Sequence, residues 1–341
     1  MGLLDIECCR GVLEMKTYHQ NGIVSEDKSI ISEDEIFAIQ CDTENGAPSF
    51  FYPGDNLIRE IDLALIDIAD LFVDIYFPDW ELYNREASNI PLGLALGGQN
   101  SDICIDKADF LDLIPQYAPY FTNLYRHLYV ADCQYLTSTV QSLLQATEHC
   151  FVQYYTQITN IDSLYYSLGE EQMTCSPETR QLAFYLETFF TKAYSILDLI
   201  VKIVFELENP IESFSSITKL KSSEKIWGNR KQLRMNGTQD TIFEDCIVIK
   251  QIEALRNEAV HNGTWEFAPK VFLRIEDSTI IERYMLFPDF EEGHLAAVKN
   301  RRHFFSSGTK VNDALIPIHE EFYRRLLTTL QNIVKYNANV E

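Results

Sequence analysis

Apolar residues recur at helical spacing along most of the chain. The first such run follows Asp55, a residue suited to an N-cap, and Pro78 ends it. A later helix starts well, with Ser176 at the N-cap and Pro177 at the first helical position. Together the runs predict helices over residues 55–77, 106–130 with breaks at Pro115 and Pro119, 132–158, 176–206, 238–261 capped by Thr238, and 312–337.

Two regions have strand character. In residues 1–53, short apolar pieces alternate with turn residues, which predicts a few short strands or irregular structure. Residues 265–274 and 280–287 flank an Asp277-Ser278 turn, which predicts a β-hairpin. The Gly-rich stretch 93–98 has no residues placed for a phosphate loop, so we expect a linker there. The fold class is therefore mainly α, with a few strands.

The two halves of the chain differ strongly in net charge. In 341 residues there are 51 Asp and Glu against 28 Lys and Arg, a formal net charge of −23. Residues 1–176 hold 28 acidic and 7 basic residues, whereas residues 177–341 hold 23 and 21. Phosphate repels so acidic a surface, which argues against general nucleic-acid binding by the N-terminal half. We expect an α-rich acidic N-terminal domain of unknown role (1–176) and a second domain (177–341).

Several classes of protein and site are disfavoured. Residues 1–10 lack the pattern of a secretory signal, and the most apolar stretch, 182–207, carries charged side chains such as Glu187, Lys192, Asp198 and Lys202. We therefore expect a cytoplasmic protein that does not cross a membrane. The eight cysteines form no C-x-x-C pair and no histidine lies at zinc spacing, so no metal and no cofactor are expected. No nucleophile elbow or zinc-protease motif occurs either.

The segment from Leu255 to Gly263 carries the residues best suited to catalysis. Its helix is expected to bury one stripe of residues, formed by Val248, Ile252, Leu255 and Ala259. Asn257 and His261 are four residues apart on a separate polar stripe, and the long side chain of Arg256 can reach the same helix end. Arg, Asn and His are thus expected to converge at one helix C-terminus.

That combination suits metal-free cleavage of RNA. A histidine can give and take protons near neutral pH, and arginine supplies a permanent charge and paired donors for a phosphate. One imidazole cannot easily act as base and acid at once, and a symmetric dimer would supply two. A simpler interpretation also stands: Arg256 pairs with Glu253 on the helix surface, and His261 is only a C-terminal capping residue.

A local basic strip interrupts the acidic sequence. It contains Trp227 and six cations against the single acid Glu224; the cations are Lys219, Lys221, Lys225, Arg230, Lys231 and Arg234. One interpretation is a solvated loop between helices. The other is an RNA-binding strip, in which Trp227 stacks on a base.

Arg256, Asn257 and His261, late in a helix that follows a long aromatic-rich helix, resemble the signature of the HEPN superfamily (higher eukaryotes and prokaryotes nucleotide-binding). The resemblance covers residues 177–341 and implies a small helical bundle, in which the β-hairpin is an insertion. It also implies a homodimer that pairs the signature helices. Active members resemble metal-independent endoribonucleases of bacterial toxin–antitoxin, abortive-infection and antiviral systems. An RNA substrate, catalytic Arg256 and His261 and a supporting Asn257 follow from that resemblance.

These residues and the resemblance are therefore compatible with two functions. The first is an endoribonuclease effector, with the acidic half sensing a trigger, binding a regulatory or antitoxin partner, or shielding the basic strip by mimicking phosphate. The second is a non-catalytic HEPN-like dimerisation and binding module, whose acidic half engages a partner.

Overall fold

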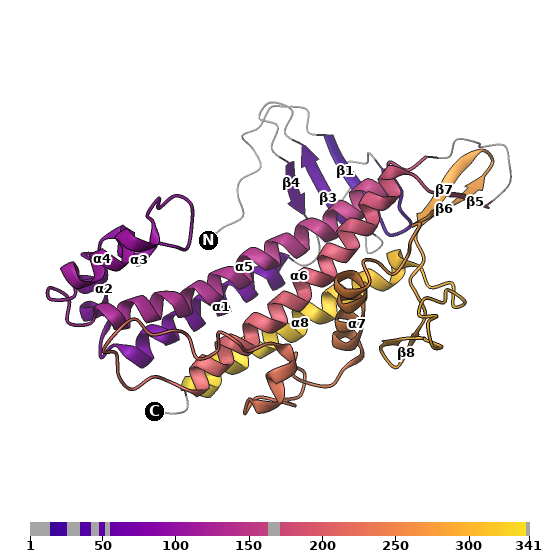
Figure 1. Cartoon of the computed structure of the whole chain (residues 1–341). Coiled ribbons are helices and arrows are strands. Elements are labelled where there is room, and N and C mark those ends of the chain that lie inside the picture. Colours follow the sequence, from indigo (N-terminus) through magenta and orange to yellow (C-terminus); the bar gives the residue numbers. More distant parts are fainter. Residues whose placement is uncertain (1–13, 26–34, 42–47, 52–54, 163–170, 339–341) are drawn as a thin grey trace. The chain divides into compact units, whose positions relative to one another are not determined.

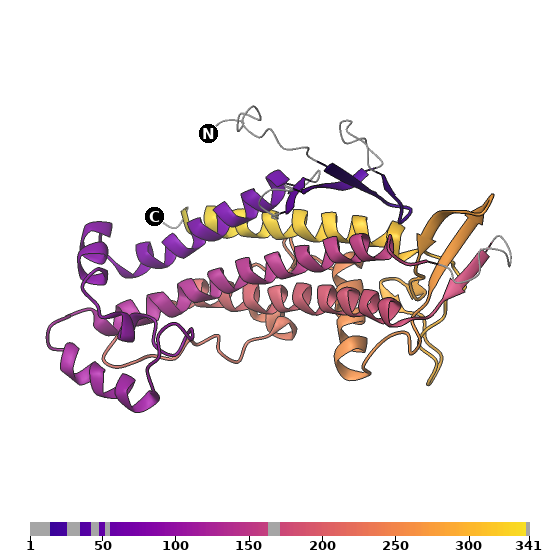
Figure 2. The same cartoon turned by 90° about the horizontal axis from the view of Figure 1, so that it is seen from above.

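The computed structural model describes residues 14–25, 35–41, 48–51, 55–162 and 171–338 (Figures 1 and 2). Within them the chain is mainly helical, as the apolar spacing predicts. The helices are α1 (Asp55–Tyr76), α2 (Trp80–Ala87), α3 (Leu92–Ala95), α4 (Lys107–Tyr117), α5 (Leu124–Ile158), α6 (Pro177–Glu208), the 3-10 helix η2 (Trp227–Gln232), α7 (Ile247–His261) and α8 (Val311–Ala338). The strands are β1 (Glu14–His19), β2 (Val24–Ser25), β3 (Glu35–Cys41), β4 (Pro48–Phe51), β5 (Glu171–Thr174), β6 (Val271–Glu276), β7 (Thr279–Tyr284), β8 (Phe290–Glu291) and β9 (His294–Leu295). None of the described helices is long and apolar enough to cross a membrane.

The chain forms two compact units, each assembled from three segments. The mixed unit comprises Met1–Ile58, Ala146–Thr191 and Cys246–Tyr323. The helical unit comprises Arg59–Gln145, Lys192–Asp245 and Arg324–Glu341. Four of the five unit boundaries fall inside helices, namely α1, α5, α6 and α8. Each unit therefore takes residues from both sides of the domain boundary predicted between residues 176 and 177.

The mixed unit contains the strands. An antiparallel sheet has the order β2-β1-β3-β4, which confirms the few short strands predicted near the N-terminus. A second antiparallel sheet has the order β5-β6-β7. Asp277 and Ser278 connect β6 to β7 with φ angles of 48° and 65°, the left-handed conformation that two-residue hairpin turns favour. The predicted hairpin is therefore confirmed, and β5 is an additional strand that the sequence pattern did not indicate.

A buried asparagine joins distant segments of the mixed unit. Asn312, near the start of α8 and 2% exposed, donates from Nδ2 to the carbonyls of Gln20 at 2.8 Å and Arg283 at 3.0 Å. Its Oδ1 accepts from the Tyr154 hydroxyl, and its own carbonyl accepts from the Tyr155 hydroxyl, both at 2.8 Å. One buried side chain thus bonds to part-buried carbonyls of the N-terminal turn and β7 and to a buried hydroxyl of α5.

In the helical unit, α1 runs alongside the segments of α5, α6 and α8 that belong to this unit (Figures 1 and 2). The buried carboxylate of Glu206 on α6 accepts from the Tyr129 hydroxyl of α5 at 2.5 Å. It also accepts from the Ser222 amide at 2.8 Å and hydroxyl at 2.6 Å. These bonds attach the loop that follows α6 to the helices, because a buried carboxylate must be satisfied by donors.

Three expected boundaries in this unit are corrected. The stretch expected to be a Gly-rich linker includes the short helix α3, whose Leu94 packs in a small core with Ile114 of α4 and Leu128 of α5. Pro115 lies inside α4 and does not end it. The following helix, α5, already begins at Leu124, earlier than the expected start at residue 132.

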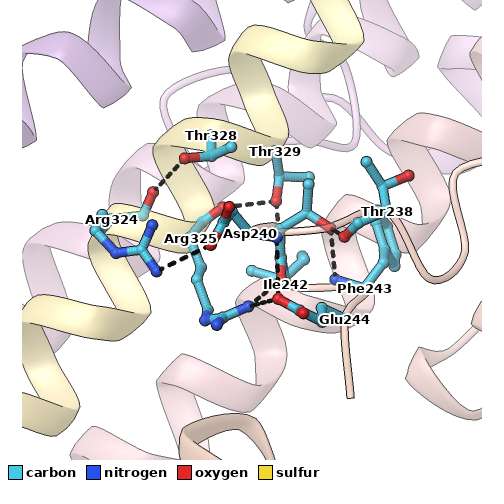
Figure 3. Close-up of polar contacts among 10 residues, drawn as sticks. Thr238, Asp240, Ile242, Phe243, Glu244, Arg324, Arg325, Thr328 and Thr329 are labelled. Carbon is cyan, nitrogen blue, oxygen red and sulfur yellow. Dashed lines mark hydrogen bonds and ion pairs between the residues drawn. The ribbon is translucent and has the colours of Figure 1, made fainter. Parts of the chain in front are cut away.

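The helix expected to start at Thr238 begins only at Ile247. Residues before it cross α8 as irregular backbone, with Ile242 and Phe243 buried and Asp240 at a φ of 59° (Figure 3). The Thr238 hydroxyl donates to the Met235 carbonyl at 2.7 Å, whereas the prediction required it to cap a helix. Tertiary contacts with α8 therefore outweigh the local helix signal here.

Candidate active site

Helix α7 presents the candidate residues at its C-terminal end. Asn262 is the C-cap, and its amide donates to the Glu258 carbonyl at 2.9 Å. Gly263 follows with a φ of 87°, the left-handed conformation expected at that position. The sequence prediction of where this helix ends is thus confirmed.

The buried face of α7 differs from the expected one. Ile252 and Leu255 are buried as expected, but Val248 and Ala259 are only half-buried. Their places are taken by Ile249 and Glu258, so the buried stripe is rotated and ends in a carboxylate. A carboxylate on a buried helix face must be hydrogen-bonded or paired with a cation, so Glu258 needs polar partners.

Arg256, Asn257 and His261 come together at this helix end. Nη1 of Arg256 donates to Oδ1 of Asn257 at 2.9 Å and lies 3.4 Å from Nε2 of His261. Arginine has only donors, so His261 presents the lone pair of Nε2 to it. The partial negative charge of the helix C-terminus favours cations such as Arg256 at this place.

A second polar group lies on the same turn of α7. The Glu258 side chain accepts from Nη1 of Arg302 at 3.2 Å and from Nδ2 of Asn262 at 2.9 Å, and Nε2 of His303 lies 3.2 Å from Oε2. In the sequence, Arg302 and His303 are part of a basic run with Arg301 that indicates either an exposed turn able to contact RNA or no function, and no motif marks Glu258. The available signal was the position of Glu258, three residues after Leu255 and therefore on its face of the helix.

The loop that carries Arg302 and His303 is held by Asp289. Its two carboxylate oxygens accept from the amides of Ser306 and Ser307 at 2.8 and 3.0 Å and from both hydroxyls at 2.6 Å. These bonds hold the pKa of Asp289 well below its usual range, because they favour its charged form. The Asp289 amide also donates to the Phe304 carbonyl, next to His303, at 2.6 Å.

The segment after α7 is anchored on α6. Trp265 is buried and packs edge-to-face on Phe190, with ring centroids 6.1 Å apart. The Thr179 hydroxyl donates to the Pro269 carbonyl at 3.0 Å. Burial raises the pKa of Glu187 on α6, and a hydrogen bond with Thr264 partly offsets this. The segment directly after α7 is therefore fixed by its contacts with α6, and these contacts support the C-terminal end of α7.

The basic strip belongs to the helical unit, whereas Arg256 and His261 belong to the mixed unit. Four of its cations are exposed, and two are half-buried; the exposed ones are Lys219, Lys221, Lys231 and Arg234. Lys225 lies over the Phe205 ring at 4.7 Å, and Arg230 lies over the Trp227 ring at 4.4 Å.

The stacking role expected of Trp227 is wrong. Its side chain is 1% exposed, and its ring stacks on Phe243 with centroids 5.7 Å apart. Its backbone amide donates to Asp198 of α6 at 2.5 Å. The indole is therefore a core element of the helical unit and is not accessible to a base.

Among the described residues, no group of three or more His, Cys, Asp and Glu side chains is arranged to hold a metal ion. The chain matches no family model, no curated protein and no solved structure. A function therefore has to be inferred from the side chains around the end of α7.

Proposed function

We propose that this protein is a metal-independent endoribonuclease of the HEPN type, acting in a bacterial toxin–antitoxin or antiviral defence system. The observation that carries the proposal is the contact of Arg256 with both Asn257 and His261 at the end of α7. An Arg and a His five residues apart in sequence need not meet, and here their side-chain nitrogens are 3.4 Å apart.

The chemistry follows from these three residues. His261 exchanges a proton with the 2′-hydroxyl or with the leaving 5′-oxygen. The attacking 2′-oxygen forms a bond to phosphorus while the bond to the 5′-oxygen breaks, leaving a 2′,3′-cyclic phosphate. Arg256 stabilises the extra negative charge on the phosphate in the transition state, and Asn257 holds the guanidinium in place.

The proposed function includes three partners, namely a second copy of the chain, RNA and a regulatory protein. Val260 precedes His261 and is 48% exposed, and Phe267, six residues after His261, is 94% exposed; these exposed apolar side chains favour a homodimer formed around α7. The four exposed cations of the basic strip are suited to the RNA backbone. The surplus of acidic residues in 1–176 suits a basic regulatory partner.

The test is cleavage of a labelled structured RNA by the purified protein in excess EDTA. We expect products with 2′,3′-cyclic phosphate ends, and a loss of at least about 100-fold in the rate for Arg256→Ala and for His261→Ala. Expression of the wild-type protein should slow cell growth, and both substitutions should relieve it.

Matched controls come from the same unit. Arg274 on β6 and His294 on β9 are exposed and lie outside the two polar groups on α7, so Arg274→Ala and His294→Ala should cleave at the wild-type rate. If the folded wild-type protein does not cleave RNA, or if Arg256→Ala and His261→Ala cleave normally, the endoribonuclease proposal is wrong. The binding module would then be the better account.

A further inference from the structure

The end of α7 holds a second histidine that the Arg–His signature does not contain. Glu258 is 6% exposed, and its carboxylate is in contact with His303, Arg302 and Asn262. The His303 side chain is 27% exposed, so its ring reaches solvent while one ring nitrogen faces the carboxylate. A buried carboxylate that faces a solvent-accessible imidazole is an arrangement that orients a proton-transfer group.

Helix geometry brings this pair next to the signature residues. At about 100° per residue, His261 lies about 40° around the helix from Asn257 and about 60° from Glu258. It therefore occupies the position between the group formed by Arg256 and Asn257 and the group formed by Glu258 and His303. Side chains three residues apart on a helix are neighbours, so the two groups border one another at His261.

The hydrogen-bond partners of His303 and His261 determine which ring nitrogen of each imidazole carries a hydrogen. A carboxylate only accepts, so His303 carries a hydrogen on Nε2, and in the neutral ring the lone pair is on Nδ1. Arg256 only donates, so in the resting protein His261 has its lone pair on Nε2. One ring is thus oriented by a carboxylate to accept a proton, and the other lies beside the cation that would bind the phosphate.

We propose that His303 is the second proton-transfer residue of the site and the general base, with Glu258 as its positioning residue and His261 as the general acid. This inference rests on the proposed endoribonuclease function. It supplies both imidazoles from one chain, so a second subunit is not needed to complete the acid–base pair.

A proton transfer accompanies each of the two bond changes. Nδ1 of His303 takes the proton of the 2′-hydroxyl, and the 2′-oxygen forms a bond to phosphorus. Once the phosphate replaces His261 as the partner of Arg256, Nε2 of His261 takes a proton from solvent. The bond from phosphorus to the 5′-oxygen breaks, and His261 gives this proton to that oxygen. Arg256 and Arg302, whose guanidinium is half-exposed beside Glu258, neutralise the phosphate charge during the step.

The experiment compares two RNA oligonucleotides that carry the mapped cleavage site, one with oxygen and one with sulfur as the bridging 5′ atom. A thiolate leaves without a proton, so loss of the general acid matters little for the sulfur substrate. We expect His261→Ala to lose at least about 100-fold on the oxygen substrate and to recover most of this on the sulfur substrate. We expect His303→Ala to lose at least about 100-fold on both.

Glu258 is tested through its effect on His303. Glu258→Gln should lower the rate on both substrates by about 10-fold or more, and it should lower it little further in a protein that already carries His303→Ala. A substitution that acted only through stability would lower the rate of both backgrounds alike. Thermal melting checks that each variant is folded, and His294→Ala is the matched control.

The outcomes separate the two proposals. If His303→Ala cleaves both substrates like the wild-type protein while His261→Ala is inactive on the oxygen substrate, the role of His303 is overturned and the endoribonuclease remains. If His303→Ala recovers on the sulfur substrate, His303 is the acid and the assignment of the base is overturned. If the wild-type protein cleaves neither substrate, the proposed function itself fails.

Discussion

The backbone amide of Ile242 donates to the side-chain oxygen of Thr329 at 3.0 Å, and the same hydroxyl donates to the Arg325 carbonyl at 2.7 Å (Figure 3). Arg325 in turn donates to the Thr241 carbonyl at 3.0 Å and to Glu244 at 2.6 Å. Side chains of α8 thus replace the helical hydrogen bonds that the segment before α7 lacks. The buried amide of Ile242 and the buried hydroxyl of Thr329 therefore both have partners.

Thr329→Val tests this relationship. Valine has nearly the same shape, so it leaves the Ile242 amide buried without its acceptor, at a cost of about 1–3 kcal/mol in the free energy of unfolding. Denaturant unfolding measures the change. The control is Thr328→Val at a half-buried position of the same helix, where the hydroxyl donates to the Arg324 carbonyl at 3.0 Å and the expected change is below about 0.5 kcal/mol. Equal effects at the two positions would contradict the role of Thr329.

Asn312 should be one of the most sensitive positions of the mixed unit. Asn312→Ala removes the hydrogen-bond donor to the Gln20 and Arg283 carbonyls. It also removes the acceptor of the buried Tyr154 hydroxyl. We expect the free energy of unfolding to fall by about 2–4 kcal/mol. Asn332→Ala, at a half-buried position of the same helix, is the matched control. Similar melting temperatures for the two variants would refute the prediction.

The loop that carries His303 depends on Asp289. Asp289→Ala removes four accepted hydrogen bonds from Ser306 and Ser307, while the packed core is left intact. We expect RNA cleavage to fall by about 10-fold, with the helices protected from amide hydrogen exchange as in the wild-type protein. Exchange of residues 303–309 should accelerate. Unchanged exchange in that loop would show that Asp289 does not hold it.

His127 should make stability depend on pH. It is buried between Phe77 and Tyr83 and contacts Glu86 at 3.1 Å. Burial lowers its pKa, and this exceeds the opposing effect of Glu86. Below an unfolded pKa of about 6.5, the unfolded chain binds a proton that the folded protein resists. The contribution of His127 to stability is therefore complete above that pH and is lost as the pH falls through the lowered pKa.

The measurement is the free energy of unfolding between pH 7.5 and 5, as a difference between wild type and His127→Gln. The variant should have a flatter curve, by at most about 1.4 kcal/mol per pH unit for one proton. His149→Gln, at an exposed position of α5, serves as the control. A variant curve parallel to that of the wild type would rule out His127 as a contributor.

The local sequence was sufficient for features that depend on neighbouring residues. The start of α6 at Ser176 and Pro177, the end of α7 at Gly263 and the turn at Asp277 and Ser278 all lie where the sequence predicts them. Each depends on a conformational preference of the residue itself or on a hydrogen bond within one turn. The convergence of Arg256, Asn257 and His261 also needs only the geometry of one helix.

Other features depend on segments far apart in the sequence. Glu258 lies 44 residues before Arg302 and 45 before His303, and no periodicity connects them. Trp227 has the sequence context of an exposed strip, yet it is buried because Phe243 and α6 cover it. The rotation of the α7 stripe from Val248 and Ala259 to Ile249 and Glu258 likewise depends on what packs against the helix.

The mainly helical class, the hairpin and one polar helix end with an Arg, an Asn and a His could therefore all be predicted from the residues alone. The tertiary structure decided which side chains are buried, that residues 238–246 are not helical, and that His303 lies on Glu258. The physical reason is that local preferences act over a few residues and are worth a fraction of a kcal/mol each. Burial and the pairing of buried polar groups are worth more, and they depend on residues that only the fold brings together.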